Sequence, residues 1–247
     1  MQNATLVALS GQVALRRKLD VIANNVANMD TAGFKRVSLD FEETTMPKAS
    51  ATLFPRRDRD NRFVRELATV HDFSAGSVEM TGNDLDVAIE ADNSFFVINT
   101  PAGERYTRAG DFGLDNTGRL VTSDGKPVLG DGGEIVFGGE ETNIAIARDG
   151  TISSSAGLKG KLRIASFPDT TVLSKEGDNL YSASAAPQAP AFIRVRQGAL
   201  EKSNVSGVEE LTAMLDVQRA YERISNMVKQ QNDLSARAIE RLGSVNA

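Results

Sequence analysis

The 247-residue sequence has no cysteine, no tryptophan and only one histidine, His71. Without cysteine there are no disulfides, thiol nucleophiles or cysteine-ligated metals. His71 has no nucleophile or metal ligand at a recognisable spacing, which argues against a histidine-dependent enzyme. Aromatic residues make up only 6% of the chain. The core must therefore be built from Val, Ile, Leu and Ala.

The sequence also lacks long apolar runs and an excess of basic residues. No stretch is apolar enough to cross a bilayer, so we expect no membrane insertion. Residues 1–15 show no basic region followed by an apolar one, so we expect no cleaved signal peptide. The net charge is −5, and the basic cluster at 56–62 is interrupted by Asp58 and Asp60. This pattern indicates a solvated loop and no nucleic-acid partner.

Patterns that could be mistaken for a chemical site do not have the required form. Asp84, Asp86, Glu90 and Asp92 do not follow the order of an EF-hand loop, and we expect them to face solvent. The glycines at 130–133 indicate a turn, and the chain has no phosphate-binding loop. We therefore expect no catalytic residue, no cofactor and no metal.

Both ends of the chain carry a helical period. Apolar residues at the N-terminus recur at spacings of 4, 3, 4 and 3, which predicts a helix from about 2 to 28. A second apolar row lies beside this stripe, at Leu6, Leu9 and Val13. The end of this helix is marked by residues that favour turns and caps, Asn28, Asp30, Thr31 and Gly33. The residues of the main stripe are Leu15, Leu19, Ile22, Val26 and Met29.

The C-terminal stripe steps by 3, 4, 3 and 4 through Met214, Val217, Tyr221, Ile224 and Val228. With Ser206 as N-cap and Glu209 in the third helical position, it predicts a helix of about 50 Å, given 1.5 Å per residue. The residues expected to widen this stripe are Leu211, Leu215 and Leu234.

The middle of the chain shows short, often β-branched runs separated by turn dipeptides such as Asp124-Gly125 and Asp149-Gly150. This pattern predicts an antiparallel β domain. The fold class is therefore α+β, with a β-rich middle between two amphipathic helices. The expected strands are 95–98, 119–122, 134–137, 143–146, 162–167 and 192–196. The expected regions are an N-terminal assembly helix at 1–30, an irregular connector at 31–69, the β-rich domain at 70–199 and a C-terminal assembly helix at 200–247.

Each terminal stripe must be buried somewhere, because an isolated helix is marginal in water. If the two helices pair as a coiled coil, each covers only part of the other's stripe, and the rest favours packing against further subunits. Periodicity alone leaves a second possibility open, in which both helices fold onto the β domain.

Three stretches are similar in order and spacing to the axial-protein family of the bacterial flagellum, which includes rod and hook subunits. The first comprises 19–28 together with Thr31, Gly33, Phe34 and Lys35. The second comprises 81–83, 85–89, 95–97, 106–110, 118, 120–122, 125 and 128–130. The third comprises 200–201, 203–205, 210–211, 214 and 218–222. In place of a Gly-rich turn before the Phe95-Phe96 strand, this chain has 91–94, Ala-Asp-Asn-Ser. Asn and Asp tolerate positive φ, so we still expect a turn there.

The resemblance implies a torque-transmitting rod of the basal body, built from copies of this chain and other rod subunits. It further implies coiled-coil terminal helices, heterologous contacts, export through the flagellar type III apparatus and assembly in the periplasm. The proximal part of the rod is the expected place, and the distal part is the alternative. The expected assembly interface consists of Leu19, Ile22, Asn24, Asn25, Val26, Asn28, Gly33, Phe34, Asn204, Val205, Leu211, Met214, Leu215, Gln218, Arg219 and Tyr221.

Two hypotheses from other classes remain at this point. One is a secreted cell-wall enzyme that uses Asp and Glu, for which loss of turnover in Asp86→Asn would be the test. The other is a soluble binding module with a helical hairpin, which predicts strong amide protection of 211–242 in the monomer.

Overall fold

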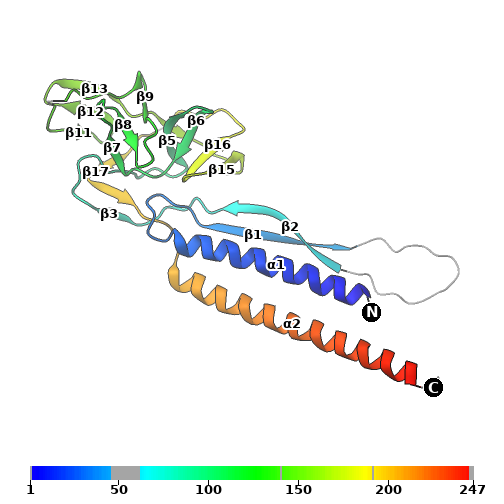
Figure 1. Cartoon of the computed structure of the whole chain (residues 1–247). Coiled ribbons are helices and arrows are strands. Elements are labelled where there is room, and N and C mark those ends of the chain that lie inside the picture. The colour runs from blue at the N-terminus through cyan, green and yellow to red at the C-terminus, as the bar shows by residue number, and fades with distance from the viewer. Residues whose placement is uncertain (1, 46–61, 140, 191, 245–247) are drawn as a thin grey trace. The chain divides into compact units, whose positions relative to one another are not determined.

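The structure of the chain, a computed structural model, describes residues 2–45, 62–139, 141–190 and 192–244. The chain divides into two compact units, each assembled from segments far apart in the sequence (Figure 1). The helical unit comprises 1–27, 37–71 and 206–247, and the β unit comprises 28–36 and 72–205. The predicted α+β class, with a helix at each end and a β-rich middle, is confirmed.

The helical unit contains both terminal helices, α1 (Gln2–Ala27) and α2 (Gly207–Ser244). Their bounds agree with those expected from the apolar periodicity. The backbone amide of Thr31 donates to the carbonyl of Asn28 at 3.2 Å, which forms a turn directly after α1. At 1.5 Å per residue, α2 is about 57 Å long and α1 about 39 Å.

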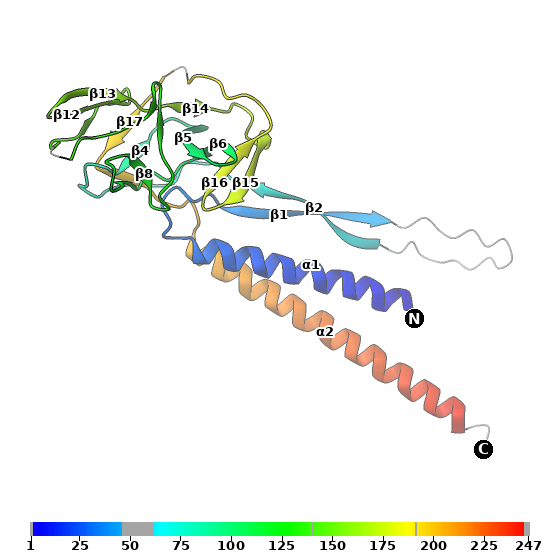
Figure 2. The ribbon, with the colours of Figure 1, turned by 45° about the horizontal axis from the view of Figure 1, so that its top comes forward.

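Two antiparallel strands complete the helical unit, β1 (Val37–Thr45) and β2 (Arg62–His71), with a register shift after Asp40. They contact α1, and both views show them alongside it (Figures 1 and 2). The expectation of an irregular connector over 31–69 is wrong for these strands, and its part at 46–61 lies outside the described residues. Val37, Leu39 and Phe41 alternate with exposed polar residues, a strand period that the nearby prolines and mixed charges obscured.

The β unit is made of short antiparallel strands. The five-stranded sheet has the order β14-β5-β6-β16-β15, β12 lies between β11 and β13, and the remaining strands pair as β9–β10, β4–β17, β3–β18 and β7–β8. The bounds are β3 (Val78–Met80), β4 (Val87–Ile89), β5 (Ser94–Thr100), β6 (Gly103–Thr107), β7 (Phe112–Leu114), β8 (Leu120–Thr122), β9 (Leu129–Gly130), β10 (Gly133–Glu134), β11 (Ala145–Ile146), β12 (Thr151–Ser154), β13 (Gly157–Lys161), β14 (Ile164–Ser166), β15 (Leu173–Gly177), β16 (Leu180–Ala183), β17 (Val195–Gln197) and β18 (Ala199–Glu201), with a 3-10 helix at Thr170–Val172.

Strand β5 lies between two hydrophobic clusters, which explains its uninterrupted apolar sequence. Phe96 and Ile98 pack into one cluster, and Phe95 and Val97 pack into the other. Successive side chains of a strand point to opposite faces, so one strand serves both cores. Most expected strands overlap observed ones, although only Glu134 of the expected 134–137 strand is in a named strand.

Two local expectations in the β unit have opposite outcomes. The turn before β5 is present, with Asn93 at φ 51°, as its tolerance of positive φ predicted. The expectation that Asp86 faces solvent is wrong, because Asp86 is buried. Its carboxylate accepts hydrogen bonds from Thr81 Oγ1 at 2.6 Å and Asn83 Nδ2 at 2.9 Å, which replace the lost water.

Candidate assembly surface

Helices α1 and α2 run in opposite directions and contact each other (Figures 1 and 2). A Cβ placed on Gly11 of α1 would lie 3.4 Å from Ile224 Cδ1 of α2, which marks where they meet. Ala8 and Ile22 are buried on the Gly11 side of α1, and Val217 is buried on the Ile224 side of α2. The two helices therefore bury one apolar seam against each other.

A second apolar row on α1 stays uncovered within the chain. Leu6, Leu9 and Val13 have exposed fractions of 54%, 52% and 54%. At about 100° per residue, they lie on the side of the helix opposite Gly11. The second row predicted beside the main stripe thus faces away from α2.

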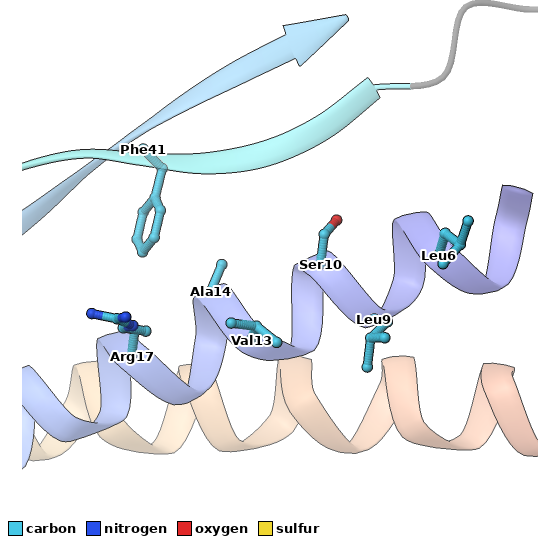
Figure 3. Close-up of a pocket in the computed structure, with 7 residues that line it drawn as sticks. All are labelled: Leu6, Leu9, Ser10, Val13, Ala14, Arg17 and Phe41. Carbon is cyan, nitrogen blue, oxygen red and sulfur yellow. The ribbon is translucent and has the colours of Figure 1, made fainter. Parts of the chain in front are cut away.

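A groove of about 370 Å³ lies along the uncovered row, between α1 and β1. In Figure 3 the ring of Phe41 points from the strand toward α1, and Ser10 and Ala14 lie on the side of the helix that faces it. Arg17 is the only charged residue among those that line the groove. The groove is therefore an apolar surface with a cation at one end.

Helix α2 has an uncovered row of the same pattern. Val208, Leu211 and Leu215 repeat the 3–4 spacing of the α1 row, and their exposed fractions are 77%, 48% and 50%. These residues lie on the far side of α2 from Val217, which is buried. The expectation that Leu211 and Leu215 widen the seam is therefore wrong, since they form a separate face.

The position of Tyr221 also differs from expectation. The apolar periodicity predicts Tyr221 in the seam, but 38% of the residue is exposed. Tyr221 lies four residues from Val217 and three from Ile224, at the border of the seam. Its ring therefore remains available on the surface of α2.

Asn25, predicted as an interface residue, makes its contacts within the helical unit. Its Nδ2 donates to the carbonyl of Val37 at 2.8 Å, and its Oδ1 accepts from the amide of Val37 at 3.0 Å. The side chain is buried, and these two bonds fix the end of α1 to the first residue of β1.

The residues predicted to form the assembly interface fall into three groups by exposure. The buried ones are Ile22, Asn25, Gly33 and Phe34. The half-buried ones are Leu19, Val26, Asn28, Asn204, Val205 and Met214. The exposed ones are Asn24, Leu211, Leu215, Gln218, Arg219 and Tyr221.

Inside the β unit, one residue from each motif stretch joins a buried ion cluster. Glu201 Oε1 accepts from Lys35 Nζ at 2.6 Å, and its Oε2 accepts from Arg108 Nε at 2.8 Å. The side chains of all three are at most 3% exposed. Residues 35, 108 and 201 are far apart in the sequence, so the cluster ties the first and last segments of this unit to its middle.

Further hydrogen bonds complete the cluster, as buried charges require. Lys35 Nζ also donates to the carbonyl of Ser74 at 2.6 Å. Arg108 Nη1 donates to the carbonyls of Ala91 and Ser94, each at 2.7 Å. The amide of Gly76 donates to Glu201 Oε1 at 2.9 Å.

Burial and pairing act against each other on the pKa values of this cluster. Burial lowers the pKa of Lys35, and the nearby carboxylate of Glu201 only partly opposes this effect. Burial would raise the pKa of Glu201, but the charges of Arg108 and Lys35 outweigh it and lower that pKa. The carboxylate is therefore held in its ionised form.

Gly33 and Phe34 are placed by the same close packing. Gly33 has φ 64°, and a Cβ there would lie 2.3 Å from the carbonyl carbon of Arg108. Its amide donates to the carbonyl of Glu201 at 2.7 Å. Lys175 Nζ lies 4.1 Å from the ring centroid of buried Phe34, a cation–π contact. Only glycine fits at position 33, where the backbone comes so close to that of Arg108.

Asn204 joins the first and last segments of the β unit. Its Oδ1 accepts from the amide of Arg36 at 2.7 Å. Its Nδ2 donates to the carbonyl of Asp72 at 2.8 Å and to Ser74 Oγ at 3.0 Å. In this chain, therefore, the Asn of the third motif is a positioning residue within the β unit.

None of the predicted interface residues is Lys35, Arg108 or Glu201, although all three stand in the stretches that resemble the axial family. The position of Glu201 offered a clue to its burial. Ala199, Glu201 and Ser203 stand at every second position, as residues on one face of an extended segment do, and all three are buried. A charged residue on the buried face of a strand requires a partner of opposite charge.

The described residues contain no group of three or more His, Asp or Glu side chains placed to hold a metal ion. Within the same described residues, neither α1 nor α2 is both long enough and apolar enough to cross a bilayer.

Three family sequence models match the chain in the order of the motif stretches. They are described as flagella basal body rod protein, matching 6–35; flagellar hook protein FlgE/F/G D1 domain, matching 88–154; and flagellar basal body rod FlgEFG protein C-terminal, matching 196–241. Together these matches include residues of both terminal helices and of the β unit, and they place the chain in the class of axial structural proteins of the flagellum.

Similarity to individual proteins extends over the whole chain. Flagellar basal-body rod protein FlgF of Caulobacter vibrioides is 39% identical over 249 residues, which cover 100% of both chains. FlgF of Mesorhizobium japonicum is 33% identical with 99% of both chains covered, and FlgG of Bacillus subtilis is 34% identical with 95% of this chain and 97% of its own covered. The chain belongs to the family of flagellar basal-body rod proteins.

The resemblance seen in the sequence is therefore confirmed. The chain is a structural subunit of the flagellar rod, which assembles with other rod and hook components. Its relatives are structural proteins and not enzymes, so the hypothesis of a cell-wall enzyme is set aside.

Proposed function

We propose that the chain is a subunit of the proximal rod, where copies pack through α1 and α2 against each other and against other rod subunits. The support for the proximal place is the full-length similarity to proteins named FlgF. The alternative is the distal rod, because proteins named FlgG are 32% and 34% identical over 95% of the chain.

The observation that carries the proposal is the uncovered apolar surface of the helical unit. Leu6, Leu9 and Val13 on α1, and two leucines of α2, Leu211 and Leu215, are about half exposed. Burying the remaining half of such a side chain gives roughly 1 kcal/mol at about 25 cal/mol per Å². Several such side chains favour association once neighbouring subunits hold the helices in place.

The predicted interface residues have two roles in this proposal. The exposed ones make contacts to neighbouring subunits, with Tyr221 and Arg219 providing the mixed apolar and polar contacts typical of interfaces. The buried ones act indirectly: Asn25 fixes α1 on β1, and Gly33 and Phe34 keep the first segment of the β unit in place.

In the assembled rod, α1 and α2 form a coiled-coil inner layer whose repeated seams give the rigidity that torque transmission needs. The subunit reaches the periplasm through the flagellar type III export apparatus, as family membership suggests. Its contacts are heterologous, so they continue along an axis without closing into a ring.

The test is swimming in soft agar of a strain whose own gene is replaced by variants of this chain. Leu215→Asp places a charge on the exposed row of α2 and is expected to abolish swimming. The matched control is Leu158→Asp in the β unit, where Leu158 is 75% exposed, and it is expected to swim normally. Normal swimming of Leu215→Asp would contradict assembly through this surface.

The place in the rod has its own test. A map of the intact basal body, with a tag inserted at 139–141, should show the tag at the proximal part of the rod. A tag at the distal part would favour the alternative.

A further inference from the structure

The two uncovered rows of the helical unit match each other in pattern. The α1 row is Leu-x2-Leu-x3-Val over 6–13, and the α2 row is Val-x2-Leu-x3-Leu over 208–215. Each covers two turns, so the ridges of one row fit the grooves of the other when the helices cross. Within one chain the rows cannot meet, because both point away from the seam between α1 and α2.

The rows also lie at different heights along the helix pair. The contact of Gly11 with Ile224 sets the register, which places the α1 row opposite residues 222–229 of α2. The α2 row is therefore about 14 residues, or about 21 Å, away along the helix axis. Rows on opposite sides and at different heights cannot form a closed, two-fold contact with each other, and they are suited to a staggered, continuing one.

The charges near the two rows have opposite signs. The α1 row is followed directly by Arg16, Arg17 and Lys18, with Asp20 as the only acid of that helix. The first ten residues of α2 contain two exposed acids, Glu209 and Asp216, and no basic residue, whereas Glu210 is buried within the chain. When the two helices run in opposite directions, the basic end of the α1 row approaches the acidic first turn of α2.

We infer that the α1 row of one copy, with its groove against β1, binds the α2 row of a second copy of this chain. Each such contact shifts the second copy by about 21 Å along the helix axis, given 1.5 Å per residue. The contact leaves one row of each copy free, so it adds further copies in one direction. This inference rests on the proposed assembly through α1 and α2, and it names which surfaces meet.

The chain has no cysteine of its own, so cysteine pairs can test this contact directly. Cells are made to depend on the variant Leu9→Cys/Leu211→Cys, and swimming is used to confirm that it is assembled. After oxidation, a blot is expected to show covalent dimers, trimers and larger species that a reductant removes. Disulfides require Cα atoms within about 7 Å, so the two cysteines of one molecule, about 20 Å apart, cannot join.

The single variants Leu9→Cys and Leu211→Cys are the matched controls and are expected to remain monomeric. Dimers from either single variant would show a two-fold contact and overturn the inference. So would a monomeric double variant in swimming cells, or a covalent product that contains a different rod protein. The general proposal would survive these results, because it is judged by the swimming of Leu215→Asp.

A second measurement uses the charges. Glu209→Arg is expected to lose most of its swimming, and adding Arg16→Glu to the same chain is expected to restore it, since each copy contributes both helices. Absence of this rescue, combined with loss of swimming in the double-cysteine variant, also overturns the inference.

Discussion

Replacing Glu201 by Gln tests the buried ion cluster of the β unit. The substitution keeps the shape of the side chain but removes the one negative charge between Lys35 and Arg108, whose side chains are 0% and 3% exposed. Both cations retain hydrogen bonds to backbone carbonyls, but neither retains its counter-charge. Breaking a buried ion pair by removing one partner costs about 3–5 kcal/mol.

For a unit of about 140 residues, that loss lowers the melting temperature by about 10–20 °C. Thermal unfolding of the purified chain can be followed by near-ultraviolet circular dichroism. Tyr106 and Tyr181 are buried in the β unit and report on its packing. The expected result is an early transition of this signal in Glu201→Gln.

The matched control is Glu79→Gln, which removes another carboxylate of the β unit. Glu79 pairs with Lys202, and the side chains of both are about half exposed. An exposed pair contributes about 1 kcal/mol or less, so the melting temperature should change by a few degrees at most. If Glu201→Gln had the same melting temperature as Glu79→Gln, the buried cluster would not be what stabilises the β unit.

Three further predictions concern the charge of Glu201, the backbone at Gly33 and the side chain of Asn25. The folded state lowers the pKa of Glu201 below 4.5, so its stabilising effect is complete above that pH and is lost as the pH falls further; unfolding in urea from pH 6 to 3 should therefore depend less on pH in Glu201→Gln than in the natural chain. Gly33→Ala places a Cβ against backbone at positive φ and should cost at least about 1–3 kcal/mol, whereas Gly113→Ala enters open space and should melt normally. Asn25→Ala leaves two buried backbone groups unpaired and should cost about 1–3 kcal/mol by urea unfolding, and exposed Asn24→Ala should cost clearly less.

The helices were predictable because their signal is local. A 3–4 apolar spacing is a property of consecutive residues, and the bounds of α1 and α2 follow from it within about two residues. The turn at Asn93 was predictable for the same reason, since tolerance of positive φ belongs to the residue itself. The β1–β2 pair was missed because its period-2 signal is short and stands among prolines and charges.

The direction in which a side chain points relative to distant segments is not a local property. Leu211 and Leu215 were expected to widen the stripe of α2, and only the burial of Val217 shows which face of that helix is covered within the chain. In the same way, Asn25 was predicted to contact a neighbouring subunit, but the path of the chain places Val37 beside it, and its amide bonds there.

By itself, the sequence determined the two amphipathic helices, the β-rich middle and the membership of the axial family, because periodicity and motif order are carried by neighbouring residues. Only the tertiary structure decided that Lys35, Arg108 and Glu201 share one buried cluster and that each helix keeps a second apolar row uncovered. Pairing across more than 90 positions and the choice of a buried face both depend on the folded path of the chain, which no short stretch of residues encodes.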